Sequence, residues 1–376
     1  MPYLIVVFFL FAFSIFEFDS HKSKLSVAVK PVLRIGYLYM ALALWFIAAF
    51  RFQTGADWQN YINMFNRSIN PNRWYGIEPG FMRLNAFFKQ YSGNFYVLQV
   101  VILTFCQGVI FYSFYKNSEC PCVTLFMYIM LNLFFTTDMA QTRQHIAMAI
   151  CLCGIPLIYK RKLILWLLLI VLAMQFHISA ILAFPLYFTM RVNINCKTAF
   201  LLLFTAAFIA LFGAKLVLGI VNTVAILPFA PKRIVSILQR YLASKTEGQA
   251  IELSSGLGFW GKYIFYIVVL FLYAVRQDTK NRYFILNFLI GIILKAMGKN
   301  FDQFGRVANY YWICGYGLFA YNILFENQKV FKLLKELQLL LCFLFMTFHF
   351  LLFYKDLSAP KNAWLPYQSF VLQGEF

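Results

Sequence analysis

The sequence predicts an all-α polytopic membrane protein that crosses the bilayer about twelve times. Three observations predict this fold class. Of the 376 residues, 62% are hydrophobic and only 12% are charged, whereas soluble domains carry roughly 25% charged residues. Apolar runs of bilayer length, or somewhat less, follow one another along the whole chain. The short loops between alternate runs all carry basic residues, as the inner loops of membrane proteins do.

The apolar runs predict the helices in chain order, each bounded by polar residues. The first run lacks the basic flank and the cleavage site of a signal peptide, so we expect it to be retained as a span. Two neighbouring runs are short for a full crossing, which leaves eleven spans as an alternative to twelve. The runs cover residues 3–16, 35–50, 95–115, 121–136, 143–159, 163–174, 177–190, 199–221, 260–275, 283–298, 309–325 and 337–354, of which 163–174 and 177–190 are the short pair.

Placing the N-terminus outside puts every short basic loop inside, for example Lys160-Arg161-Lys162. Two longer loops, at about 51–94 and 222–259, then face outward. Membrane orientation therefore accounts for much of the net charge of +19, and we expect no nucleic-acid partner. No repeat or low-complexity linker divides the chain, so we expect a single transmembrane domain over residues 1–376.

The eight cysteines and four histidines are scattered. None of the cysteines falls in an outward-facing loop, so a disulfide framework is not expected. Cys120-Pro-Cys122 and Cys151-Leu-Cys153 lack the spacing and the second ligand pair of a zinc site. We expect neither a metal ion nor a cofactor.

Polar residues gather first around the outer end of the second run. Arg51 ends this run, and Asp57 and Tyr61 are four residues apart, so they share a face if a helix begins after Gly55. Glu78 precedes a Pro-Gly turn further along the same loop. An interfacial helix with a snorkelling arginine and an aromatic belt is the alternative interpretation of this stretch.

Four more polar residues lie at the outer ends of later runs. Arg143 falls in the first turns of a span, where the helix dipole already favours an anion. His177 occupies a polar notch between two apolar runs, and an intramembrane histidine is a functional candidate. Arg306 and Tyr310 are four residues apart at another outer end. Snorkelling, a local hydrogen bond and an aromatic belt are the structural alternatives.

All of these residues project to the outer side in a layout that was derived from the inner loops alone. This coincidence favours an outer cavity lined by arginines and carboxylates. Such a cavity suits a lipid diphosphate, because arginine binds phosphate in a planar fork and stays charged when it is partly desolvated. The residues concerned are Arg51, Asp57, Glu78, Arg143, His177 and Arg306.

The order of these motifs resembles the EpsG group of Wzy-type polymerases, which build bacterial O-antigen and capsular polysaccharide. The first two motifs in tandem are the most specific, and the similarity spans most of the chain. The motifs are Phe50-Arg51-Phe52-x-Thr54-Gly55-x-Asp57-Trp58-x-x-Tyr61, Glu78-Pro79-Gly80-Phe81, Arg143-Gln144-x-Ile146-Ala147, Phe176-His177-x-Ser179-Ala180, Arg306-x-x-x-Tyr310 and the tail Trp364-Leu365-Pro366-Tyr367.

The resemblance implies an enzyme, a membrane glycosyltransferase of the bacterial inner membrane with its active face in the periplasm. It would transfer a growing glycan from undecaprenyl diphosphate onto a new repeat unit linked to undecaprenyl diphosphate. The implied fold is GT-C-like. The chain lacks a large periplasmic domain, so loops 51–94 and 222–259 would recognise the acceptor. A chain-length regulator is a candidate partner, beside the lipid-linked oligosaccharides and the membrane lipid.

The resemblance also suggests roles for the polar residues. The catalytic candidates are Asp57, Glu78 and His177, one of which would take the proton of the acceptor hydroxyl. The sequence leaves the choice among the three open. The residues that would bind the diphosphates or the glycan are Arg51, Arg143, Arg306, Tyr61 and Tyr310.

Other classes are weighed against the polymerase, among them another transfer of lipid-linked glycans, such as that of a ligase. A flippase of lipid-linked oligosaccharides should carry basic residues at mid-membrane depth, and Lys215 and Lys295 are the only ones inside the predicted spans. A secondary transporter should show inverted repeats or paired broken helices, and only the stretch 163–190 resembles a broken helix. A membrane acyltransferase should pair its catalytic histidine with an acid or a second histidine nearby in the sequence. His177 has no such neighbour.

Overall fold

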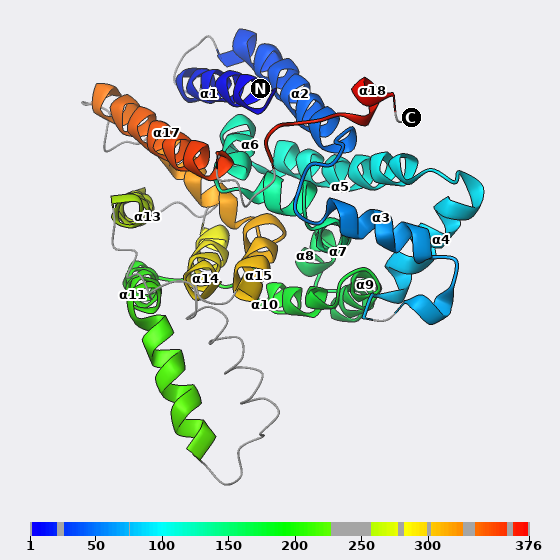
Figure 1. Ribbon diagram of the computed structural model, residues 1–376. Coiled ribbons are helices and arrows are strands. Elements are labelled where there is room, and N and C mark those ends of the chain that lie inside the picture. Colours follow the sequence, from blue (N-terminus) through cyan, green and yellow to red (C-terminus); the bar gives the residue numbers. More distant parts are fainter. Residues whose placement is uncertain are drawn as a thin grey trace.

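The computed structural model describes residues 2–20, 26–74, 76–226, 257–276, 282–298, 302–325, 335–358 and 364–374. Helices dominate these residues, and the β-structure recorded among them is an isolated bridge between Arg51 and Ser369. Figure 1 shows the helices arranged as a bundle in which segments distant in sequence lie side by side. The prediction of an all-α fold is confirmed.

Five helices among the described residues are long and apolar enough to cross a membrane: Lys30–Ala49, Phe95–Asn117, Cys196–Gly213, Gly258–Val275 and Leu337–Leu357. They belong to α2 (Ser26–Ala49), α5 (Phe95–Asn117), α11 (Cys196–Ile226), α13 (Leu257–Arg276) and α17 (Lys335–Leu357). Shorter apolar helices include α1 (Pro2–Ser20) and α14 (Arg282–Gly298). These helices indicate a multi-pass membrane protein, and the number of twelve spans stays a prediction.

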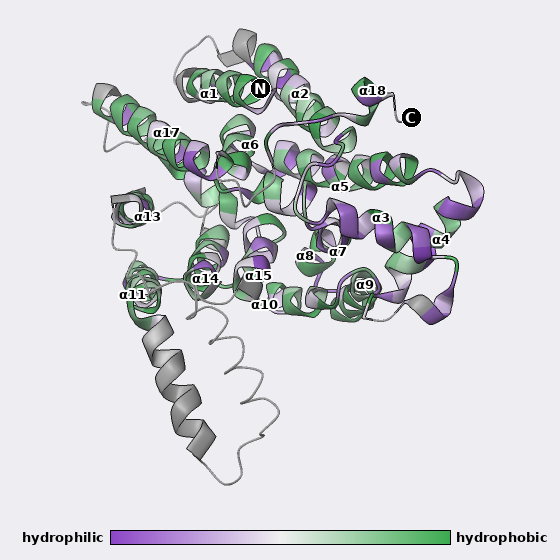
Figure 2. Cartoon of the chain, in the orientation of Figure 1, coloured by the Kyte–Doolittle hydropathy of each residue, from purple (hydrophilic) through white to green (hydrophobic). Residues whose placement is uncertain are grey.

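The first of the two predicted outer loops, 51–94, contains helices. It contains α3 (Trp58–Arg67), the 3-10 turn η1 (Pro71–Arg73) and α4 (Pro79–Tyr91). Pro79 begins α4 at the first helical position, where its missing N–H costs no hydrogen bond. Figure 2 shows hydrophilic residues along α3, whereas the surrounding helices are largely hydrophobic. The second predicted loop, 222–259, lies mostly outside the described residues.

Several predicted runs form interrupted helices. The run 121–136 divides into α6 (Pro121–Met130) and a short π-helix, η2 (Phe134–Asp138), and the next into α7 (Thr142–Cys153) and α8 (Ile155–Tyr159). The short pair forms α9 (Leu163–Met174), then the 3-10 helix η3 (Ile178–Ala183) and α10 (Leu186–Thr189). Interruptions leave backbone groups free to bind side chains or ligands.

The predicted run 309–325 begins earlier than the sequence indicated. Here α15 spans Asp302–Ile313 and is followed by η4 (Gly317–Tyr321) and α16 (Asn322–Phe325). Residues 302–309 are largely polar, so hydropathy alone did not locate the start of this helix. Because the helix begins at Asp302, Arg306 and Tyr310 both lie on regular helix, one turn apart, as predicted.

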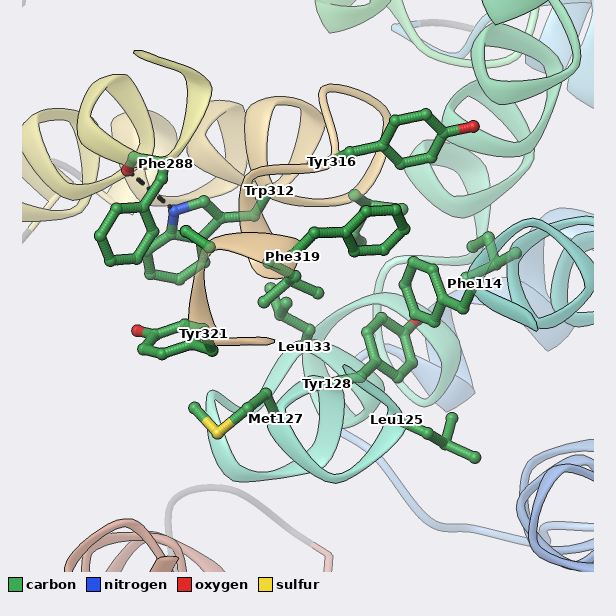
Figure 3. Packing of buried hydrophobic residues seen from close by; sticks show 14 of the residues in the cluster. Phe114, Leu125, Met127, Tyr128, Leu133, Phe288, Trp312, Tyr316, Phe319 and Tyr321 are labelled. Atoms are coloured by element: carbon green, nitrogen blue, oxygen red, sulfur yellow. Dashed lines mark hydrogen bonds between the residues drawn. The ribbon is translucent and has the colours of Figure 1, made fainter. Parts of the chain in front are cut away.

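The core lies where α5, α6, α14, α15 and η4 meet, and aromatic rings fill it. Figure 3 shows Phe114 beside Tyr128, and Trp312 beside Phe288. Phe114 and Tyr128 pack edge to face with ring centroids 5.6 Å apart, and Phe288 packs against Tyr321 in the same way at 5.2 Å. Such pairs add roughly 0.5–1.5 kcal/mol beyond the apolar area they bury.

The C-terminal tail holds the end of α2 in place. The amide of Phe52 donates to the carbonyl of Gln368 at 2.9 Å, and the amide of Phe370 donates to the carbonyl of Phe50 at 3.2 Å. The hydroxyl of Tyr367 donates to the carbonyl of Ile47 at 3.1 Å. The tail therefore fixes the backbone on both sides of Arg51. It ends with α18 (Phe370–Gln373), which lies close to α2 in Figure 1.

Candidate functional site

Glu78 and Arg143 form an ion pair at the centre of the candidate site. Arg143 Nη1 lies 2.5 Å from Glu78 Oε2, and the side chains are 23% and 14% exposed. Glu78 precedes α4 but does not cap it, so its carboxylate is free to reach α7. Its other oxygen, Oε1, accepts a hydrogen bond from the amide of Ile178 at 3.1 Å. One carboxylate thus connects three separate segments of the chain.

Arg143 lies in the first turn of α7, at the positive end of the helix dipole. A guanidinium has five N–H donors, and the hydrogen bond to Glu78 uses one of them. The Nε of Arg143 is buried without a hydrogen-bond partner. The ion pair therefore fixes the orientation of the guanidinium and leaves donors available for a further anion.

His177 immediately precedes η3, as its N-cap, and forms a short chain of hydrogen bonds. Its Nδ1 accepts a hydrogen bond from the amide of Ser179 at 3.3 Å and lies 2.6 Å from the Ser179 hydroxyl. That hydroxyl lies 3.1 Å from the hydroxyl of Tyr310 on α15. The charges of Glu78, Arg143 and Arg306 all act on the imidazole. His177 is therefore a proton acceptor held among the charged groups of the site.

Arg306 lies on α15 with an exposed side chain. Its backbone carbonyl accepts a hydrogen bond of 2.7 Å from the side-chain Nε2 of Gln144, the neighbour of Arg143 on α7. This bond joins the two helices that carry the two arginines. The structure therefore places Arg143 and Arg306 around one imidazole, although 162 residues separate them along the chain.

Tyr61 interacts with Arg143 of the ion pair, and Arg51 lies near Tyr61. Burial raises the pKa of the Tyr61 hydroxyl, and the neighbouring Arg143 opposes this rise. Arg51 is only 2% exposed, and its Nη1 donates to the carbonyl of Ala48 at 2.9 Å. Burial lowers the pKa of Arg51 to about 10, so it stays charged at neutral pH.

Asp57, half-buried, accepts a hydrogen bond from Asn60 at 3.3 Å.

A second polar cluster, formed around Asp138, is buried next to Arg51. Asp138 accepts hydrogen bonds of 2.5 Å from Gln107 and from Tyr128, and its Oδ1 lies 3.6 Å from Nε2 of His145. The negative charge of Asp138 acts on Arg51. The cluster thus supplies counter-charge to a buried guanidinium, which would otherwise be costly to bury.

Two glycines permit close backbone contacts at the site. A Cβ on Gly80 would lie 2.6 Å from Cβ and 2.7 Å from the carbonyl oxygen of Gln175. Next to it, the amide of Phe81 donates to that same carbonyl at 3.2 Å. Gly55 has φ +102°, and a Cβ there would lie 2.4 Å from the carbonyl oxygen of Met139. Both glycines allow the outer loop to reach the helices that carry Arg143 and His177.

Gly80→Ala should therefore destabilise the protein by about 1–3 kcal/mol, the usual cost of overpacking. The measurement is the thermal midpoint of the purified protein in detergent. Gly108→Ala is the matched control, because a Cβ at this helical position meets nothing within 4 Å. Alanine should be neutral or stabilising there. Equal midpoints for the two variants would contradict the close contact.

Glu78→Gln should remove the charge that orients Arg143 while keeping the shape of the side chain. We expect a coupling free energy between Glu78 and Arg143 of about 1.5–3 kcal/mol in a double-mutant cycle, as for hydrogen bonds between charged groups. Asp57→Asn paired with Arg143→Gln is the control cycle and should give less. Thermal unfolding of the wild type, the three single variants and the two double variants measures both cycles, and equal coupling would contradict the assigned ion pair.

Cavities occur elsewhere in the described part of the bundle. An apolar groove of about 630 Å³ runs between α2 and α5, past Tyr37, Leu38 and Trp45. A second cavity, of about 570 Å³, lies between the start of α2 and the end of α5, and a third, of about 490 Å³, carries lysines and lies beside α13. The outer cavity predicted around Arg143 and Arg306 stays a prediction.

Sequence reasoning missed three contributors to the site. Ser179 was visible only as a motif residue, and its hydroxyl proves to join His177 to Tyr310. Gln144 looked like an ordinary helix residue beside an arginine, yet it binds the backbone of Arg306. Asp138 follows two threonines at the end of an apolar run. A carboxylate at this position is itself an indication of a functional site.

The chain was compared with known families, curated proteins and solved structures. The model of the EpsG family matches residues 34–369, which include every residue of the candidate site. No curated protein matches the chain, and no solved structure matches it.

Proposed function

The chain belongs to the EpsG family, and from this premise we propose that it polymerises a polysaccharide at the outer face of the bacterial inner membrane. Its substrates would be oligosaccharide repeat units linked to undecaprenyl diphosphate. The observation that carries the proposal is the convergence of Glu78, Arg143, His177 and Arg306 from four separate elements. Such a site can bind a diphosphate and accept a proton in one place.

The proposed reaction transfers the growing glycan to the new repeat unit. A hydroxyl oxygen of the acceptor sugar forms a bond to the anomeric carbon of the donor, and the bond from that carbon to the diphosphate oxygen breaks. The bonding electrons leave with the diphosphate, and the hydroxyl proton passes to a base. The products are a lengthened glycan, still linked to the acceptor lipid, and free undecaprenyl diphosphate.

Arg143 and Arg306 would bind the leaving diphosphate. Arg143 has a buried, unpaired Nε and lies at a helix N-terminus, and both features favour an anion. Negative charge grows on the leaving oxygen during the transfer, so these donors would stabilise the transition state more than the ground state. Glu78, whose two oxygens already bind Arg143 and Ile178, would position the guanidinium.

We assign the role of base to His177. Its Nδ1 already accepts a hydrogen bond, and the Ser179 hydroxyl next to it can relay a proton from the acceptor sugar. Glu78 is engaged by its ion pair, and Asp57 accepts a hydrogen bond from Asn60. Arg51 and its counter-ion Asp138 would then hold the loop that carries Tyr61, and Tyr310 would orient Ser179.

A deletion strain tests the function. Its surface glycan should consist of single repeat units, and complementation with the full chain should restore the ladder of longer chains on a gel. Loss of even the single-unit product would show that export or ligation is the missing step. That outcome would overturn the polymerase in favour of a flippase or a ligase.

A further inference from the structure

A cavity of about 490 Å³ lies on the other side of α15 from the candidate site. Its walls come from α11, α13, α14, α15, α17 and the turn after α6. Three lysines line it, Lys262 on α13, Lys295 on α14 and Lys355 on α17. The volume falls within the roughly 300–1,000 Å³ of typical ligand pockets. We call it the lysine cavity.

Lys295 is the most deeply placed of the three lysines. Its ammonium lies 5.4 Å from the centre of the Trp312 ring, and this cation–π contact holds the charge at the cavity wall. Trp312 is itself fixed, because its Nε1 donates to the carbonyl of Phe288 at 3.3 Å, as Figure 3 shows. Within the described residues no carboxylate forms an ion pair with Lys295. Its three N–H donors can therefore meet an anion.

His349 provides a second sign of a missing ligand. The residue is 1% exposed and lines the lysine cavity. Its Nδ1 lies 3.0 Å from the carbonyl of Phe345, to which it donates, and its Nε2 is buried without a hydrogen-bond partner. Buried polar atoms are usually paired. Because Nδ1 carries the proton, Nε2 is a hydrogen-bond acceptor, and a hydroxyl of a ligand that enters the cavity would complete the hydrogen bonding of this ring.

The acidic residue at the rim does not neutralise the three lysines, so the lysine cavity keeps an excess of positive charge. Asp356 is the one acidic residue among the described residues that line it, against three lysines. Its Oδ2 accepts a hydrogen bond of 2.6 Å from Asn132. Asn132 follows α6 with φ 58°, a left-handed conformation that asparagine tolerates. The lining therefore combines excess positive charge with aromatic walls from Tyr263 and Tyr266.

The lysine cavity and the candidate site share α15 as a common wall. Tyr310 points to Ser179 and the candidate site, whereas Trp312, two residues on, lines the lysine cavity. Two residues correspond to a rotation of about 200° around a helix, so these side chains lie on opposite faces. Figure 1 likewise shows α15 between α14 and α10.

We propose that the lysine cavity binds the diphosphate head group of the second lipid-linked oligosaccharide. The inference rests on the proposed function, because transfer between two lipid diphosphates requires both head groups to be bound at the same time. Lysine binds phosphate as a point charge and does not impose the planar geometry of arginine. This suits the acceptor lipid, which must move to the arginine site before the next transfer. The arginine site then binds the leaving diphosphate, and the lysine cavity binds the one that stays attached.

Binding stoichiometry tests this assignment. The purified full chain in detergent is titrated with radiolabelled undecaprenyl diphosphate, and the bound lipid is counted per protein. Wild type should bind two equivalents. Lys262→Gln combined with Lys295→Gln should bind one, and so should Arg143→Gln. Lys160→Gln, which removes a lysine from an exposed inner turn, is the matched control and should bind two.

Each remaining outcome decides between the two proposals. If wild type binds one equivalent and only Arg143→Gln loses it, the lysine cavity is not a substrate site and the proposed function stands. If one equivalent is bound and only the lysine variant loses it, the lysine cavity stands and the arginine site fails. If wild type binds none, both proposals fail. If the double variant does not fold, Lys355→Gln at the exposed rim replaces it. This variant should lower the affinity for the second equivalent at least fivefold.

A bilayer phospholipid could offer the same phosphate chemistry. The titration is therefore repeated in an excess of phosphatidylglycerol, which carries one phosphate and no pyrophosphate bond. Both equivalents should remain bound. If phosphatidylglycerol displaces the equivalent that the lysine variant lacks, and leaves the other, the cavity belongs to a structural phospholipid and the inference is overturned.

Discussion

Arg143→Gln should reduce the surface glycan to single repeat units and slow the transfer by about 10²–10³, the usual cost of losing one donor to a developing negative charge. Glutamine keeps hydrogen-bonding capacity but removes the charge and the fork that bind a diphosphate. The change also leaves Glu78 without its partner at 2.5 Å. Glycan length on gels, together with the rate of purified protein in detergent, measures the effect.

Arg83→Gln is the matched control for this variant. Arg83 lies on α4, five residues from Glu78, with an exposed side chain. Its loss should leave the ladder unchanged at equal membrane expression. A normal ladder from Arg143→Gln would mean that the guanidinium does not act on the leaving diphosphate.

His177→Gln should lower kcat by about 10²–10⁴, the range that general base catalysis contributes. KM should change little, because the imidazole acts on the proton and the arginines bind the head group. Ser179→Ala should cost less than His177→Gln, because the hydroxyl only relays the proton to Nδ1 at 2.6 Å. Steady-state kinetics of the three proteins give the comparison.

The same kinetics can identify a different base. If Glu78→Gln abolishes turnover while His177→Gln retains most of it, Glu78 is the base and is released from Arg143 when substrate binds. A rise in KM alone for His177→Gln would assign the histidine to substrate binding. Either pattern contradicts the role proposed for His177.

The sequence was sufficient to predict the all-α fold class and most of the apolar helices. Apolar runs located these helices because hydrophobic length is a property of the chain itself, whereas the number of membrane crossings stays a prediction. Alternating basic loops predicted that Glu78, Arg143, His177 and Arg306 share one side of the membrane, and the structure brings these four together. That this side is the outer one stays a prediction. Asp57 and Tyr61 lie next to them, with Tyr61 in contact with Arg143.

Features that depend on three-dimensional contact could not be predicted from the sequence. Arg51 was expected to bind substrate, but the structure buries it beside Asp138 under a C-terminal tail more than 300 residues away. The start of α15 was missed because its first residues are polar. The hydrogen bonds of Ser179 and Gln144 cross between helices, and no spacing along the chain encodes them.

The most direct test of the polymerase is reconstitution from pure components. Purified protein in detergent is mixed with repeat units linked to undecaprenyl diphosphate, and both the glycan length and the released lipid are followed. We predict a ladder in which each new glycosidic bond releases one undecaprenyl diphosphate, and no ladder with Arg143→Gln. A ladder that forms without release of the lipid diphosphate would contradict the proposed function, and so would the absence of a ladder from wild-type protein whose thermal unfolding shows that it is folded.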